Sequence, residues 1–133
     1  MKINTKVRYG LRAMIEVAEK GKFDPVRTSE LAQSQDLSVK YLEALMVKLK
    51  NAGLVHSVRG NKGGYLLARK ASTITAYDIF LALDESFEIV PCLCEDRVCE
   101  RNEFCGTKEL WKELAGSMEN KLKAIRLENL TEN

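Results

Sequence analysis

The most informative stretch of the chain runs from Leu37 to Arg69 and reads LSVKYLEALMVKLKNAGLVHSVRGNKGGYLLAR. Its first part is helical in pattern, with Ser38 in the position of an N-cap, Gly53 at the expected end, and a buried stripe of Leu42, Leu45, Met46 and Leu49. Beyond Gly53 the apolar period changes to two over residues 54–59 and 65–68, and the glycine-rich loop between them carries a lysine. The stretch therefore predicts a helix followed by a basic β-hairpin.

Upstream of this stretch the sequence predicts two further helices. The first follows Thr5 as N-cap and ends at Gly21, with a helical stripe of Val7, Leu11, Met14, Ile15 and Ala18. The second is short, begins after Thr28 as N-cap and ends near Asp36. Two helices joined by a short turn are typical of a helix-turn-helix, and the basic hairpin that follows is typical of a wing. The expected fold class is mainly α with a small β-hairpin wing, a winged helix-turn-helix.

The C-terminal part predicts a long helix. Thr75 and Asp78 have the spacing of a capping box that opens a helix through Leu83, and a cysteine-rich loop follows. From Thr107 to about Leu127 one apolar stripe continues, made of Leu110, Trp111, Leu114, Met118, Leu122 and Ile125. We interpret it as a dimerisation helix, with packing back onto its own domain as the alternative. The expected units are residues 1–84 for DNA binding, 85–106 for the cysteine loop, and 107–133 for the dimerisation helix and tail.

Length and charge limit the classes of protein that fit. A chain of 133 residues, 45% of them hydrophobic, suits one domain with an appendage. The net charge of +2 is unevenly distributed: residues 1–70 hold 14 Lys/Arg against 6 Asp/Glu, and residues 71–133 hold 7 against 13. The longest apolar run, Ile79 to Leu83, is far too short for a membrane span, and the N-terminus has no apolar signal core. We expect a cytoplasmic protein whose basic half faces an anionic partner.

Double-stranded DNA is the partner that this basic half predicts. The start of a helix can enter the major groove, where short side chains reach base edges and backbone amides favour phosphate. We expect Ser38, Lys40 and Glu43 to read bases, and Tyr41 and Ser38 also to suit phosphate oxygens. In the hairpin loop we expect contacts to the neighbouring groove from Arg59, Gly60 and Lys62. Taken singly, each of these residues could equally be a solvated surface residue.

All four cysteines fall in one short window, Cys92-x-Cys94-x4-Cys99-x5-Cys105. In a reducing compartment such clustering indicates metal or redox chemistry more than structural disulfides. The uneven gaps favour an iron-sulfur cluster over zinc, whose ligands usually come as C-x2-C pairs, and thiol redox chemistry without a cofactor is the remaining alternative. No catalytic triad, phosphate-binding glycine loop or paired carboxylates are present, so we expect no enzyme activity.

The stretches KVRYGLRAM, LSVKYLEAL, GLVHSVRGNKGGYLLAR and LALDES, followed by the cysteine loop and ELW, resemble the IscR, NsrR and CymR group of bacterial winged-helix transcription regulators. The resemblance covers nearly the whole chain. It implies a homodimer, held by the long last helix, that binds a palindromic operator and senses iron-sulfur status, nitric oxide or cysteine supply. It also implies DNA contacts at Ser38, Lys40, Tyr41, Glu43 and Arg59.

The same resemblance implies a cluster on the cysteine loop, with a [2Fe-2S] cluster favoured over [4Fe-4S] or zinc. The family's three cluster cysteines best match Cys92, Cys99 and Cys105, and Cys94 is extra. Where the IscR pattern has a histidine, this chain has Lys108, which is protonated near neutral pH and a poor ligand for iron. The fourth ligand is then either Cys94, which gives an all-cysteine site and is the hypothesis we prefer, or a residue of the partner subunit.

Overall fold

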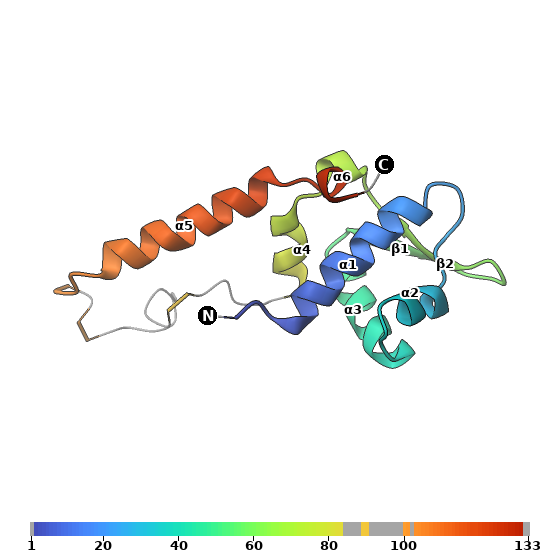
Figure 1. Cartoon of the computed structure of the whole chain (residues 1–133), viewed down its shortest axis with the longest axis horizontal. Coiled ribbons are helices and arrows are strands. Elements are labelled where there is room, and N and C mark those ends of the chain that lie inside the picture. Colours follow the sequence, from blue (N-terminus) through green and yellow to red (C-terminus); the bar gives the residue numbers. More distant parts are fainter. Residues whose placement is uncertain (1, 84–88, 91–99, 102, 132–133) are drawn as a thin grey trace.

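The computed structural model describes residues 2–83, 89–90, 100–101 and 103–131. In chain order its elements are α1 (Thr5–Lys20), α2 (Thr28–Ser34), α3 (Val39–Asn51), β1 (Val55–Val58), β2 (Gly64–Leu67), the 3-10 turn η1 (Ala71–Thr73), α4 (Ala76–Leu83), α5 (Lys108–Ala124) and α6 (Leu127–Leu130). Helices α1 to α4 and the hairpin cluster together, while α5 extends away from them (Figure 1). The mainly α fold with a two-stranded hairpin confirms the predicted fold class.

A single hydrophobic core joins the helices of the N-terminal part. Its fully buried side chains include Val7 and Met14 of α1, Leu31 of α2, and Ile79 of α4. The predicted stripe of α3 is buried there as well, as Leu42, Leu45, Met46 and Leu49. Burial of each such side chain stabilises the fold by about 1.5–3 kcal/mol relative to exposure. The core thus fixes which face of α3 remains outside.

Helix ends agree with the sequence at some positions and differ at others. Ser38 is the N-cap of α3, and Thr75 and Asp78 exchange backbone-to-side-chain hydrogen bonds of 2.9 and 3.1 Å, as predicted. The predicted caps Thr5 and Thr28 are wrong by one residue, because each lies inside the first turn of its helix. The Asn4 side chain accepts from the Lys6 amide instead and caps α1. The helix therefore begins one residue earlier, with a carboxamide in place of the expected hydroxyl as its cap.

The turn between α2 and α3 is tight and well bonded. Asp36 has a positive φ of 54° and follows the end of α2. The Leu37 amide donates to the Ala32 carbonyl at 2.9 Å, and the Asp36 amide donates to that of Gln33 at 3.2 Å. These bonds satisfy carbonyls that the end of a helix leaves open, and aspartate tolerates the left-handed conformation better than most residues. The turn sets α3 at a fixed angle to α2.

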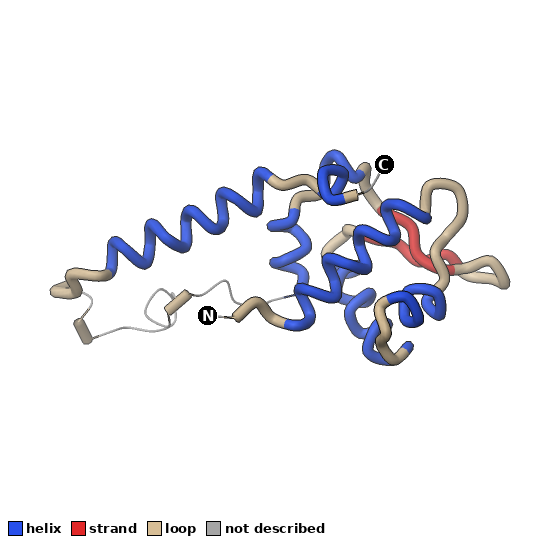
Figure 2. The backbone as a smooth tube through the Cα atoms, in the orientation of Figure 1, coloured by secondary structure: helices blue, strands red, loops and turns tan. Residues whose placement is uncertain are grey.

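The long C-terminal helix ends earlier than predicted. It leaves helical geometry after Ala124, and residues 125–127 run beside residues 74–76. The Ala76 amide donates to the Ile125 carbonyl and the Leu127 amide to the Ile74 carbonyl, both at 2.8 Å. Leu127, fully buried in the core, then begins α6. The predicted unit 107–133 therefore includes a segment that packs within the N-terminal part, visible where α6 returns toward α1 (Figure 2).

Helix α5 packs on α4 near its C-terminal end only. Leu122 lies against the core, and the Lys123 ammonium lies 4.7 Å from the centre of the Tyr77 ring. Near the other end Leu110 is 53% and Leu114 43% exposed. No helix among the described residues has both the length and the apolar character required to cross a membrane. Within the part of the chain that the structure describes, Leu110 and Leu114 of the α5 stripe are thus left exposed.

Candidate nucleic-acid interface

The first turn of α3 presents polar side chains to solvent. Ser38, Lys40 and Glu43 are exposed, while Leu42 between them points into the core. The Ser38 hydroxyl accepts the Tyr41 amide at 3.1 Å, which leaves its own proton available to donate outward. Because the helix dipole is positive at this end, the turn favours an anion such as a phosphate. The structure places the residues predicted from the sequence on one exposed turn.

Tyr41 differs from its neighbours because its ring is half-buried. It meets Tyr9 of α1 edge to face, with 6.3 Å between ring centres and 88° between planes. The Arg12 guanidinium lies over the other ring of the pair, 5.6 Å from the centre of Tyr9. Such contacts fix α1 against α3 and place a further cation, Arg12, beside the first turn of α3.

The hairpin loop carries the predicted basic residues on its surface. Arg59, Gly60 and Lys62 are exposed, and Val58 pairs with Gly64 at the last position of the two strands. The loop is closed by a 2.9 Å hydrogen bond from the Gly63 amide to the Gly60 carbonyl. Gly60 has a φ of +115°, a conformation that other residues rarely adopt. The predicted wing residues thus lie at the outer end of a tight hairpin.

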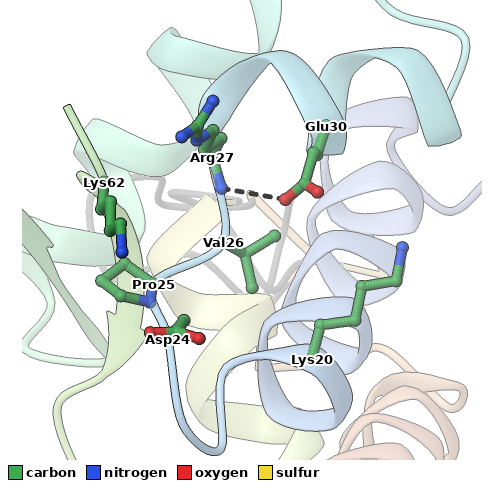
Figure 3. Close-up of a pocket in the computed structure, with 7 residues that line it drawn as sticks. All are labelled: Lys20, Asp24, Pro25, Val26, Arg27, Glu30 and Lys62. Atoms are coloured by element: carbon green, nitrogen blue, oxygen red, sulfur yellow. Dashed lines mark hydrogen bonds between the residues drawn. The ribbon is translucent and has the colours of Figure 1, made fainter.

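The hairpin is attached directly to the segment that leads into α2. Val26 and Tyr65 exchange two backbone hydrogen bonds of 2.9 Å, an isolated antiparallel bridge beside the two-stranded sheet. A Cβ atom at Gly64 would lie 2.2 Å from the Val26 carbonyl oxygen, so this approach requires glycine. The Arg27 guanidinium donates to the Asn61 carbonyl at 3.0 Å. Figure 3 shows Arg27 and Lys62 among the side chains that line a polar cleft beside this segment.

Tyr65 joins the base of the wing to α2. Burial and the negative charge of Glu43 raise the pKa of the Tyr65 phenol, and a hydrogen bond with the Thr28 side chain acts in the opposite direction. The phenol is therefore bonded to the first residue of α2. The first turn of α3 and the wing both lie in the part of the molecule opposite the N-terminal end of α5 (Figure 1).

Of the predicted cysteine site, only Cys105 lies within the described residues, and Cys92, Cys94 and Cys99 lie outside them. The Cys105 thiol is partly exposed, and its Sγ lies 3.3 Å from the Thr107 Oγ1. Hydrogen bonds from the Thr107 side chain and backbone lower the pKa of this thiol below its usual value of 9.0. A thiolate is the form of cysteine that binds metals and reacts with oxidants, so this environment suits both kinds of chemistry.

Lys108 is the first residue of α5. It occupies the position at which the IscR pattern has a histidine. Within the described ranges no three His, Cys, Asp or Glu side chains come together in a group that could hold a metal ion. His56 of β1 is exposed on the hairpin. Neither Lys108 nor His56 therefore adds to the predicted ligands.

Comparison with known proteins places this geometry in a family. Residues 3–133 match the Rrf2 family model, described as an iron-dependent transcriptional regulator. The protein rrf2 of Nitratidesulfovibrio vulgaris is 41% identical over 98% of this chain and 87% of its own length, and IscR of Photorhabdus laumondii is 37% identical over 100% and 80%.

A solved structure shares the fold as well as the sequence. CymR, the global cysteine regulator of B. subtilis, superposes with a TM-score of 0.80 at 40% identity and covers 98% of this chain and 95% of its own. These relatives are transcription regulators and not enzymes, as predicted for this chain from its lack of catalytic motifs. With an exposed recognition turn, an attached basic wing and a family match over nearly its full length, the chain belongs to the Rrf2 family of transcriptional regulators.

Proposed function

We propose that this protein binds a palindromic DNA operator as a homodimer, with the start of α3 in the major groove and the wing in the groove beside it. The observation that carries the proposal is that the exposed first turn of α3 and the exposed hairpin loop are both bonded to the α2 region. The bonds are the Leu37–Ala32 and Val26–Tyr65 backbone hydrogen bonds. Lys40 and Glu43 have the chemistry to read guanine and cytosine edges, and Ser38 can donate to a phosphate. Arg59 and Lys62 extend the positive charge along the wing.

Homodimerisation is the second part of the proposal. A groove of about 440 Å³ between α1, α4 and α5 is lined mostly by apolar side chains, namely Ile3, Val7, Leu11, Phe80, Met118 and Leu122. Leu110 and Leu114 continue the exposed apolar surface along α5. Apolar surface of this extent is typical of an interface, and a second α5 has a matching stripe. A two-fold dimer would place two copies of α3 in major grooves about 34–36 Å apart.

For the signal we propose an iron-sulfur cluster held by the cysteine loop. The donors would be Cys92, Cys99 and Cys105, with Cys94 as the fourth. The Cys105 thiol fits such a group, because Thr107 holds its pKa low and favours the thiolate. When bound, a cluster supplies a redox-sensitive and oxygen-sensitive centre whose gain or loss alters the loop. The family's description as iron-dependent supports this signal.

Thiol sensing without iron is the second candidate. A partly exposed cysteine of lowered pKa is the kind of thiol that oxidants attack first, and Cys105 has both properties. The likeness to a global cysteine regulator supports this alternative. A zinc site would use the same thiolates and give a colourless protein.

Anaerobic purification followed by visible spectroscopy, with iron, sulfide and zinc analysis, separates these candidates. A cluster protein is coloured and contains iron and sulfide, and Cys94→Ala is expected to lose the colour as Cys92→Ala does. Full colour in Cys94→Ala would show that Cys94 is not a ligand. Colourless, metal-free protein whose DNA affinity changes with peroxide and is restored by a thiol reductant would replace the cluster with a thiol switch.

DNA binding is tested on a duplex selected by the wild-type protein from a random pool. The affinity is expected to fall steeply with salt concentration. Arg59→Ala is expected to weaken binding and to reduce the slope of log affinity against log salt concentration by about 1, the value for one phosphate contact. Glu128→Gln, which removes an exposed carboxylate of α6, is the control and is expected to leave binding unchanged. Failure of the wild-type protein to select or bind any duplex would contradict the proposed function.

A further inference from the structure

The segment between α1 and α2 makes hydrogen bonds to the wing at two places. At the base of the hairpin, Val26 and Tyr65 exchange two backbone hydrogen bonds of 2.9 Å. At its outer end, the Arg27 Nη2 donates to the Asn61 carbonyl at 3.0 Å, across 34 residues of sequence. Within the loop around Asn61, the backbone hydrogen bond is the one from the Gly63 amide to the Gly60 carbonyl. Arg27 therefore supplies a fixed point for a loop with little internal structure.

Arg27 is itself held in place by α2. It is the residue before the first turn of this helix, and its amide donates to the Glu30 carboxylate at 3.3 Å. Thr28, the next residue, makes a hydrogen bond with the Tyr65 phenol, and α2 is held to α3 by the turn in which the Leu37 amide donates to the Ala32 carbonyl at 2.9 Å. The Arg27 backbone thus belongs to the start of a helix joined to α3, where Figure 3 shows its bond to Glu30, while its guanidinium bonds the wing loop.

We infer that Arg27 is a positioning residue that sets the wing relative to α3, so that Arg59 and Lys62 reach DNA together with the recognition turn. This inference rests on the proposed DNA binding. A guanidinium suits this role because several N–H donors lie in one plane, so that it can hold a carbonyl and still present N–H groups outward. The bond is made to a backbone carbonyl, so it fixes the path of the loop whatever side chain Asn61 carries.

The first test measures the wing without DNA. Amide ¹⁵N relaxation of residues 59–63 is expected to show increased fast motion in Arg27→Ala, while the amides of α3 keep their wild-type values. Lys22→Ala removes an exposed cation from the same inter-helix segment and is expected to leave the loop unchanged. Unchanged motion of residues 59–63 in Arg27→Ala would overturn the inference even if the wild-type protein binds DNA.

The second test is a double-mutant cycle on the duplex selected by the wild-type protein. Arg27→Ala is expected to weaken binding on the order of tenfold, as for loss of one charge-assisted hydrogen bond. In an Arg59→Ala, Lys62→Ala background the same change is expected to have almost no further effect, because the contacts it positions are gone. A full additional loss in that background would mean that Arg27 contacts DNA independently of the wing, and would overturn the inference.

The two tests also separate this inference from the proposed function. Wild-type protein that binds no duplex contradicts the proposed function, and the relaxation measurement still decides whether Arg27 orders the wing. An Arg27→Ala variant that binds DNA as tightly as the wild-type protein contradicts the inference alone. Arg27→Lys gives a graded control, because the ammonium keeps the charge but loses the planar set of donors; it is expected to restore part of the affinity.

Discussion

Glu16 is a buried carboxylate whose replacement by glutamine should lower the free energy of unfolding by about 2 kcal/mol near neutral pH. Glu16 lies on α1 and is only 7% exposed. Its carboxylate accepts from Lys20 Nζ at 2.7 Å, from Gln35 Nε2 at 3.0 Å, and from the Ser34 hydroxyl. Two of these donors lie at the end of α2, so the carboxylate connects α1 to the helix-turn-helix.

The magnitude follows from the donors. A hydrogen bond to a charged group contributes about 1.5–3 kcal/mol, and an uncharged one about half of that. Glutamine keeps one acceptor oxygen of the same size, but its amide nitrogen faces donors that need an acceptor. The decrease in the free energy of unfolding is therefore larger than the contribution of one neutral hydrogen bond. It is smaller than the summed contributions of three hydrogen bonds to a charged carboxylate.

The pH dependence provides a second measurement of the same effect. Burial acts to raise the pKa of Glu16, but the hydrogen bonds from Lys20, Ser34 and Gln35 together outweigh it, so that the pKa lies below 4.5. A group whose pKa is lower in the folded state stabilises the fold fully above its unfolded pKa. That stabilisation is lost as the pH falls through the folded pKa. The difference between wild type and Glu16→Gln should hold at neutral pH and shrink below pH 4.5.

Urea denaturation at a fixed protein concentration, followed by circular dichroism at several pH values, measures both effects. Glu113→Gln is the matched control, since it removes an exposed carboxylate from α5. A Glu16→Gln protein as stable as wild type near neutral pH would refute the reasoning. So would a difference in stability that grows on acidification, since that would require a raised pKa for Glu16.

Three further predictions concern other parts of the chain. Leu127→Ala should lower the free energy of unfolding by about 3 kcal/mol in urea denaturation because it empties a fully buried position, whereas Leu130→Ala, at a site 38% exposed, should cost much less. The rate of Cys105 alkylation can be followed by peptide mass spectrometry on metal-free protein at a series of pH values. The midpoint of its rise with pH should lie below the usual thiol pKa of 9.0, and Thr107→Val should raise that midpoint. Ser38→Ala should cost about 1 kcal/mol of stability, while Ser38→Asp should keep the cap but weaken DNA binding through repulsion of phosphate; equal DNA affinity in both variants and wild type would remove Ser38 from the interface.

The sequence by itself determined the local elements and most of the candidate interface. The period of apolar residues located α1, α3 and α4, and short-range chemistry located several ends, such as Ser38 before α3 and Thr75 with Asp78 before α4. Those signals act over three or four residues, so they can be recognised in a linear sequence. The candidate DNA contacts on α3 and the wing followed from the same local patterns, because the exposed side of an amphipathic helix is defined once its buried side is known.

Only the tertiary structure decided how these elements meet. The bonds between Val26 and Tyr65 and between Arg27 and Asn61 join residues more than 30 positions apart. Nothing in the local sequence marks them, since a backbone carbonyl accepts a hydrogen bond whatever its side chain. The same applies to Leu127, which the sequence predicted as the approximate end of one continuous helix. Burial of Leu127 and its backbone hydrogen bond to Ile74 outweigh helix continuation, because a contact with a distant segment is available only after the core has formed.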